Sequence, residues 1–229
     1  MLTVAQRAVR VLCGLGFVVV MTGCASLSSV PLVGREAPEI VPGVVAPSER
    51  IAELRRLRDE AGSASPEEKQ RVAAELAGQL AKEPDGSLRA EIVRTLAVYP
   101  TDVAMRILRH AIEDADVQVR IAVCEAWAQI GDAEAVRLLG ATLDGDPDVD
   151  VRLAAAKALG RTGNPDAALA LAPALADSDP AMQYRATLSL RRVTGKDFGT
   201  IAAWQQHLNR AYTPESRPHA VAERPRAAF

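Results

Sequence analysis

Residues 114–163, DADVQVRIAVCEAWAQIGDAEAVRLLGATLDGDPDVDVRLAAAKALGRTG, contain one predicted helical hairpin and the start of a second with the same residue pattern. When the segment that begins at Val117 is laid over the segment that begins at Val149, equivalent residues lie 32 positions apart. In this alignment Trp127 matches Leu159, and Leu143 matches Leu175. Helical periodicity within a repeat of this length predicts a solenoid of stacked helical hairpins.

The same register extends in both directions and defines an apolar stripe on each helix. We call the two helices of each hairpin its first and second helix, in chain order. Successive first helices are offset by 31, 32 and 31 residues. Their stripes are Leu88, Ile92 and Leu96; Val119, Val123 and Trp127; Val151, Ala155 and Leu159; and Met182, Ala186 and Leu190. The second helices carry Ala104, Leu108 and Ile112; Ala135, Leu139 and Leu143; and Ala167, Leu171 and Leu175. Stripes this small do not stabilise a lone hairpin, so the units are expected to stack.

The second helices also show recognisable ends. Thr101, Asp132 and Asn164 are expected N-caps, with Pro165 in the first helical position after Asn164. Pro173 falls inside the second helix of the third unit and is expected to kink that helix.

A polar pattern marks the start of each first helix. Aspartate and arginine recur four residues apart, and the fourth unit keeps the aspartate but has Gln183; the members are Asp85 and Arg89, Asp116 and Arg120, Asp148 and Arg152, and Asp179. An aspartate at this position caps a helix. Neighbouring helices lie roughly 8 to 10 Å apart, so an arginine can reach the carboxylate of the next unit. We therefore predict an inter-repeat ladder that fixes the stacking register.

The ends of the array are less regular. Helices are expected from Ser48 to Gly62 and from Pro66, where Ser65 and Glu68 form a capping box. A closing helix containing Trp204 is expected to cover the last unit.

This combination of aspartate, Val-Arg, Ala-rich helix and Leu-Gly resembles bacterial HEAT-like repeats from Pro66 to about Phe198. The resemblance implies an all-α fold, a right-handed α-solenoid of HEAT-like hairpins. It does not imply one activity, because such repeats occur in scaffolds, bilin lyases, hydroxylases and DNA repair proteins.

The N-terminus has the pattern of an export signal. Arg7 and Arg10 precede an apolar run from Val11 to Met21, which is too short for an ordinary transmembrane helix. Met21-Thr22-Gly23-Cys24 resembles a bacterial lipobox, with Met21 in place of the usual leucine. The resemblance implies cleavage before Cys24, acylation of Cys24, and a palmitate-type lipid anchor; ordinary secretion is the alternative. Because Ala25 follows the cysteine, the resemblance points to the outer membrane, facing the periplasm.

The expected organisation has four parts. Residues 1–23 form the signal peptide, 24–47 a Pro-containing flexible tether, 48–211 the repeat domain, and 212–229 a disordered tail.

Several kinds of chemistry are disfavoured by the residues present. The formal net charge of −2 becomes −4 once Arg7 and Arg10 leave with the signal, which disfavours nucleic acid. The acidic run Asp144 to Asp150 fails the EF-hand pattern, the three histidines share no metal-ligand spacing, and Cys124 is expected to be a packed thiol. No metal or cofactor is expected.

These observations favour a non-enzymatic, membrane-anchored scaffold or adaptor in the cell envelope that binds an unidentified protein or peptide. The expected binding residues lie on the second helices, outside the packing stripes, and are Arg106, Arg109, His110 and Arg137. A solvated face with no partner is the plain alternative for these residues. The alternative hypotheses for the function of the protein are a structural subunit of an envelope complex and a lyase or modifying enzyme.

Overall fold

The structure is a computed structural model that describes residues 46–211. Within these residues the chain forms ten α-helices and one 3₁₀ helix. In order they are α1 (Pro47–Glu60), α2 (Pro66–Leu80), α3 (Gly86–Leu96), α4 (Asp102–Ala111), α5 (Val117–Ile130), α6 (Ala133–Gly145), α7 (Val149–Leu159), α8 (Ala167–Leu171), η1 (Pro173–Ala176), α9 (Pro180–Thr194) and α10 (Ile201–Ala211). The predicted signal peptide, most of the tether, and the tail lie outside the described residues.

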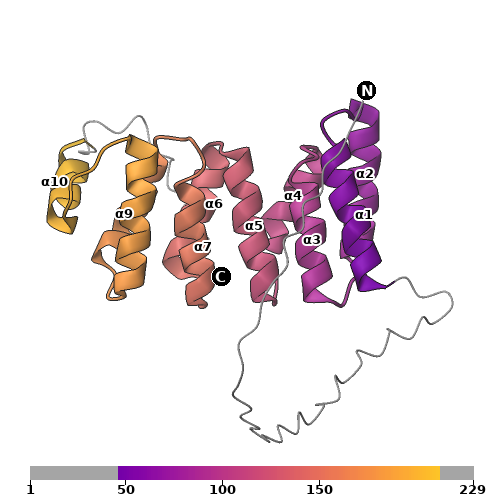
Figure 1. Ribbon diagram of the computed structural model, residues 1–229, viewed down its shortest axis with the longest axis horizontal. Coiled ribbons are helices and arrows are strands. Elements are labelled where there is room, and N and C mark those ends of the chain that lie inside the picture. The colour runs from indigo at the N-terminus through magenta and orange to yellow at the C-terminus, as the bar shows by residue number, and fades with distance from the viewer. Residues whose placement is uncertain (1–45, 212–229) are drawn as a thin grey trace, which may run out of the picture. The chain divides into compact units, whose positions relative to one another are not determined.

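The helices pair into hairpins that stack in chain order. The first helices form one layer, in which α1 packs on α3, α3 on α5, α5 on α7, and α7 on α9. Figure 1 shows these helices side by side in a row, as an α-solenoid requires. In the second layer α2 packs on α4, and α6 on α8. The predicted all-α solenoid of stacked hairpins is confirmed.

The core lies between the two layers and follows the predicted stripes. All twelve stripe residues of α3, α5, α7 and α9 are buried, from Leu88 to Leu190. The stripes of the second helices are also buried, except that Ile112 is only partly covered. Small alanine side chains at many of these positions allow the helices to approach closely.

The helix ends follow local sequence signals with two exceptions. Ser65, Thr101 and Asp132 accept backbone N–H groups as N-caps. The prediction for Asn164 and Pro165 was wrong, because α8 begins two residues later at Ala167. Asn164 instead accepts the N–H of Asp166 within the preceding turn, at 3.0 Å.

Pro173 does not merely kink the second helix of the third unit, as predicted, but interrupts it. The α-helix α8 ends at Leu171, and the chain continues from Pro173 as the 3₁₀ helix η1. Proline lacks an N–H and clashes with the preceding turn, which accounts for this break.

The last hairpin is closed by aromatic packing. Trp204 of α10 is fully buried, and its ring meets that of Phe198 edge-on at a centroid distance of 4.8 Å. His207 stacks on the same phenyl ring. The expectation that Trp204 covers the last unit is thereby confirmed.

Candidate functional site

The predicted polar pattern is present as four helix caps. The carboxylates of Asp85, Asp116, Asp148 and Asp179 each accept a backbone N–H in the first turn of their own helix. For example, Asp148 accepts the N–H of Asp150 at 2.9 Å. These carboxylates satisfy amides that would otherwise lack partners.

The arginines bridge the repeats, but to different carboxylates from those predicted. Arg89 donates from Nε and Nη2 to Asp114, at 3.1 and 2.8 Å. Arg120 donates in the same way to Asp146, at 2.9 and 3.1 Å. The prediction that Asp116 and Asp148 would be their partners was wrong, because these two carboxylates are engaged with the amides of their own helices.

A second acidic position lies two residues before each cap, and in the first three units it carries the bridge. Its side chain accepts the N–H of the cap residue, which holds it in the loop; the members are Glu83, Asp114, Asp146 and Asp177. This recurrence was visible in the sequence at the same offsets as the caps. Since it lies so close to the caps, spacing alone did not separate the two roles.

Each arginine also holds the loop before its own helix. Arg89 Nη1 donates to the carbonyls of Glu83 and Pro84, and Arg120 Nη1 to those of Asp114 and Ala115. One guanidinium therefore joins two successive loops. Planar guanidinium geometry suits such a double, bidentate contact.

The series has a beginning and an end. At its beginning, Arg50 of α1 donates to Glu83. At its end, Arg152 donates to the carbonyls of Asp146 and Pro147 but, in the described part of the chain, makes no ion pair with Asp177. Gln183 keeps only the carbonyl contact, to Asp177, at 2.7 Å.

These bridges shift the acidity of the groups involved. Burial acts to raise the pKa of Asp114, but hydrogen bonds from Arg89 and from the amide of Asp116, with the nearby positive charge, hold it below its ordinary value. The pKa of Asp146 is lowered in the same way, with Arg120 as donor. Both carboxylates are thus committed to stacking.

A second set of ion pairs crosses the first helices. Arg58 of α1 contacts Glu91 of α3 at 2.9 Å, and Arg94 of α3 contacts Glu125 of α5 at 2.9 Å. Arg94 also lies 3.3 Å from Glu91, so the four side chains form one connected row. This row was not predicted from the sequence, although Arg58 and Glu91, and Arg94 and Glu125, lie about one repeat apart.

The four expected partner-binding residues lie on the exposed face of α4 and α6, which we term the basic face (Arg106, Arg109, His110 and Arg137). Arg109 donates to both carboxylate oxygens of Glu134 on α6, at 2.7 Å each. This hydrogen bond lowers the pKa of Glu134 and raises that of Arg109. Arg137 lies 3.7 Å from the same carboxylate.

The remaining two residues of the basic face have no such commitment. Arg106 and His110 are exposed and, among residues 46–211, their side chains make no hydrogen bond or ion pair. Arg109 therefore contributes to joining α4 and α6, whereas Arg106, His110 and part of Arg137 remain open to solvent. The structure thus brings all four together but gives them different roles.

The acidic side chains of the turn before α7 take part in the contact between repeats and in capping α7. Asp146 binds Arg120, and Asp148 caps α7. Across residues 46–211, no group of three or more histidine, cysteine or acidic side chains is placed to hold a metal ion.

Cys124 is fully buried, and burial raises the pKa of its thiol to about 12. A thiol with so high a pKa is a poor nucleophile near neutral pH. Cys24, the predicted lipid attachment site, lies outside the described residues.

None of the helices in the described region is long and apolar enough to cross a bilayer.

Comparison with known proteins agrees with this repeat geometry. No curated protein matches the chain. A family model described as HEAT repeats matches residues 73–148 and 136–212, which together span more than half of the 229 residues. The chain therefore belongs to the HEAT-repeat family.

Proposed function

We propose that this protein is a lipid-anchored scaffold of the cell envelope that binds a protein or peptide partner through its basic face. HEAT repeats are generally protein-binding scaffolds and usually not catalysts. The anchor would be Cys24, and the site would face the periplasm from the outer membrane. The lipobox-like segment supports the anchor, and the helices described above support the scaffold.

The observation that carries the binding site is the exposed pair of helices α4 and α6. The Arg109–Glu134 ion pair joins one second helix to the next, and Arg106 and Arg137 are exposed on the same pair of helices. Arginine is enriched where protein interfaces concentrate their binding energy. The partner that fits such a surface is an acidic segment of a protein or a peptide.

The test of the binding site is charge reversal. The variant Arg106→Glu/Arg137→Glu is expected to lose a partner that copurifies with the full chain from membranes. The matched control, Lys157→Glu/Arg161→Glu, reverses two exposed charges near the end of α7 and is expected to keep it. Identical sets of copurifying proteins from both variants would contradict this assignment of the face.

The anchor has a separate test. Cells supplied with labelled palmitate are expected to label the wild-type chain but not Cys24→Ala. An unlabelled wild-type chain would rule out the lipid anchor while leaving the binding site unaffected. A constant stoichiometry with the same envelope proteins would instead favour a structural subunit.

A further inference from the structure

The second helices are not evenly packed against one another. In their layer α2 packs on α4 and α6 packs on α8, whereas α4 and α6 approach each other little. Arg109 of α4 and Glu134 of α6 bridge this space near the start of α6. Further along, a hollow of about 580 Å³ lies between the end of α4 and the C-terminal half of α6. The space between the two helices is thus bridged by an ion pair at one end and hollowed at the other.

Apolar side chains form the centre of this hollow. Ile112 and Leu138 line it, and each is only partly buried against the core. Ala141 also lines it and is exposed, one turn beyond Arg137 on α6, and its methyl group leaves the space unfilled. The hollow can therefore take an aliphatic side chain from another molecule, which removes apolar surface of both molecules from water.

The charged groups that line the hollow differ in whether they already have partners. Asp114 and Asp146 accept hydrogen bonds from arginines in the bridges between repeats. Glu113 is exposed and, among residues 46–211, its side chain makes no hydrogen bond or ion pair. A free carboxylate therefore stands at this end of the space between α4 and α6.

The other end of the space carries free positive charge. Arg106 precedes Glu113 by seven residues, so the two lie on one face of α4, about 10 Å apart along the helix axis. Arg106 is exposed and, within the described region, unpaired. Arg137 occupies the equivalent position of α6 and lies 3.7 Å from Glu134. The order along the space is therefore positive, apolar, negative.

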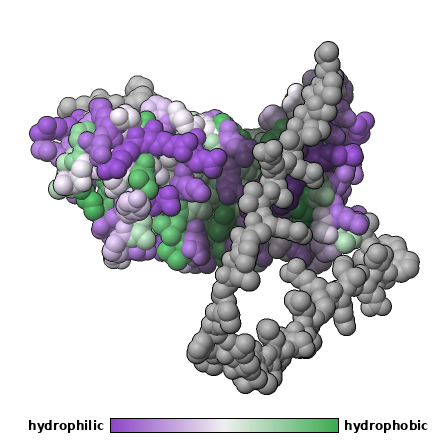
Figure 2. Space-filling model, viewed as in Figure 1, coloured by the Kyte–Doolittle hydropathy of each residue, from purple (hydrophilic) through white to green (hydrophobic). Residues whose placement is uncertain are grey.

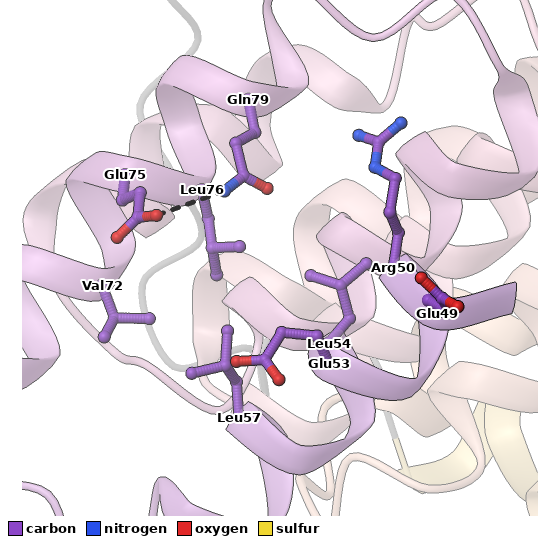
Figure 3. Close-up of a pocket in the computed structure, with 9 residues that line it drawn as sticks. All are labelled: Glu49, Arg50, Glu53, Leu54, Leu57, Val72, Glu75, Leu76 and Gln79. Carbon is purple, nitrogen blue, oxygen red and sulfur yellow. Dashed lines mark hydrogen bonds between the residues drawn. The ribbon is translucent and has the colours of Figure 1, made fainter. Parts of the chain in front are cut away.

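Apolar surface alone would not direct a partner to this space. Figure 2 shows, on the face in view, apolar residues in patches that hydrophilic residues separate. A second groove, of about 480 Å³, opens between α1 and α2. Figure 3 shows the apolar side chains that turn toward it, which are Leu54, Leu57, Val72 and Leu76. Three glutamates also line this groove, and its one lining arginine, Arg50, is held by the buried Glu83. Its charge is therefore unsuited to an acidic segment.

We propose that the partner binds between α4 and α6 through a segment that is acidic at one end, aliphatic in the middle and basic at the other end. This inference rests on the proposed function of the basic face. The acidic end meets Arg106 and Arg137, the aliphatic side chain enters the hollow, and the basic end meets Glu113. About three residues of an extended chain span the distance between the two ends. Opposite charges at both ends fix the direction in which the segment lies.

The test is photo-crosslinking of the full chain in cells that produce it. A photoreactive amino acid at position 137 detects binding at the basic face, and one at position 141 detects entry into the hollow. Both positions are expected to capture the same protein. Mass spectrometry is expected to place both crosslinks in one short segment with the stated order of charges. Position 75, in the groove between α1 and α2, is the control and is expected to capture none of this protein.

Filling the hollow tests the aliphatic contact. Ala141→Trp, combined with the photoreactive amino acid at position 137, is expected to lower the yield of captured partner about tenfold, because an aliphatic side chain is no longer buried. Ala74→Trp, at an exposed position of α2, is the matched control and is expected to keep the yield. Urea denaturation of both variants checks that each remains folded. An unchanged yield from Ala141→Trp would overturn the proposal.

Reversing the free carboxylate tests the other end of the segment. Glu113→Lys is expected to lower the yield from position 137 several-fold, since it would repel the basic end. Glu67→Lys reverses another exposed carboxylate, on α2, and is expected to have no effect. Equal yields from the two variants would contradict the assigned direction of the segment.

Failure of this inference differs from failure of the proposed function. Capture from position 137 without capture from position 141 would overturn the inference and leave the basic face as the binding site. Capture from neither position would contradict both.

Discussion

Arg120 joins two repeats through a single side chain. Its Nη1 donates to two carbonyls in the loop before α5, while Nε and Nη2 donate to Asp146 in the loop before α7. The side chains of Arg120 and Asp146 are only 11% and 7% exposed. At this depth, losing one partner leaves an uncompensated charge in a poorly hydrated site.

Replacing Arg120 with alanine is therefore expected to lower the free energy of unfolding by about 3 kcal/mol. Arg152→Ala provides a matched control, because Arg152 makes the equivalent carbonyl contacts without the ion pair. Its expected loss is about 1 kcal/mol. Urea denaturation of both variants measures the difference, and equal losses would show that the ion pair with Asp146 does not stabilise the stack.

The bridging carboxylates also predict how stability depends on pH. The pKa values of Asp114 and Asp146 are lowered in the folded protein, so the unfolded chain binds protons more readily. Their contribution is complete above the ordinary carboxyl pKa of about 4 and is lost as the pH falls below it.

Acid titration of the free energy of unfolding is expected to show a smaller loss in Asp114→Asn/Asp146→Asn than in the wild type. The exposed pair Asp144→Asn/Asp150→Asn serves as the control and is expected to follow the wild type. If both double variants follow the wild type, the lowered pKa values of Asp114 and Asp146 do not contribute to stability.

At the scale of single elements, the turns that follow the first helices of the hairpins depend on glycine. Gly131 ends α5 with φ of +68°, a conformation that glycine adopts without strain. A Cβ at this position would lie 2.4 Å from the carbonyl oxygen of Thr162 in the next unit. Gly195 ends α9 with nearly the same φ, +67°, but a Cβ there meets nothing within 4 Å.

The two glycines separate backbone strain from close stacking. Gly195→Ala is expected to lower the free energy of unfolding by about 1 to 2 kcal/mol, the cost of the left-handed conformation. Gly131→Ala is expected to cost more, because the loop at Thr162 must also move. Thermal unfolding compares the two, and equal shifts would mean that this approach between repeats is not tight.

Local elements were well predicted from the sequence, since caps and apolar stripes depend on neighbouring residues. The caps at Asp116 and Asp148 are examples, whereas at Pro173 a kink was predicted and the α-helix is interrupted instead. The predicted carboxylate partners of Arg89 and Arg120 were wrong, because the choice of partner depends on how the loops stack in three dimensions. The groove between α1 and α2 was not predicted either, since the spacing of apolar residues along a helix does not determine how far two helices lie apart.

At the scale of the whole molecule, each hairpin contacts mainly its neighbours, so the described region offers long surfaces and two dissimilar ends. The ion pairs of Arg89 and Arg120 join successive repeats, and the four residues of the basic face take no part in them. Arg106, His110 and Arg137 make none of these bridges, whereas Arg109 joins α4 to α6 through Glu134. This separation allows the exposed side chains to suit a partner without altering the core.

The central claim, that this solenoid binds a partner through its basic face, is tested most directly by photo-crosslinking in living cells. A photoreactive amino acid at position 106 or 137 is expected to capture the same protein. The same amino acid at positions 118 and 129, both exposed on α5, is expected to capture none of it. Capture from α5 but not from positions 106 and 137 would contradict the account.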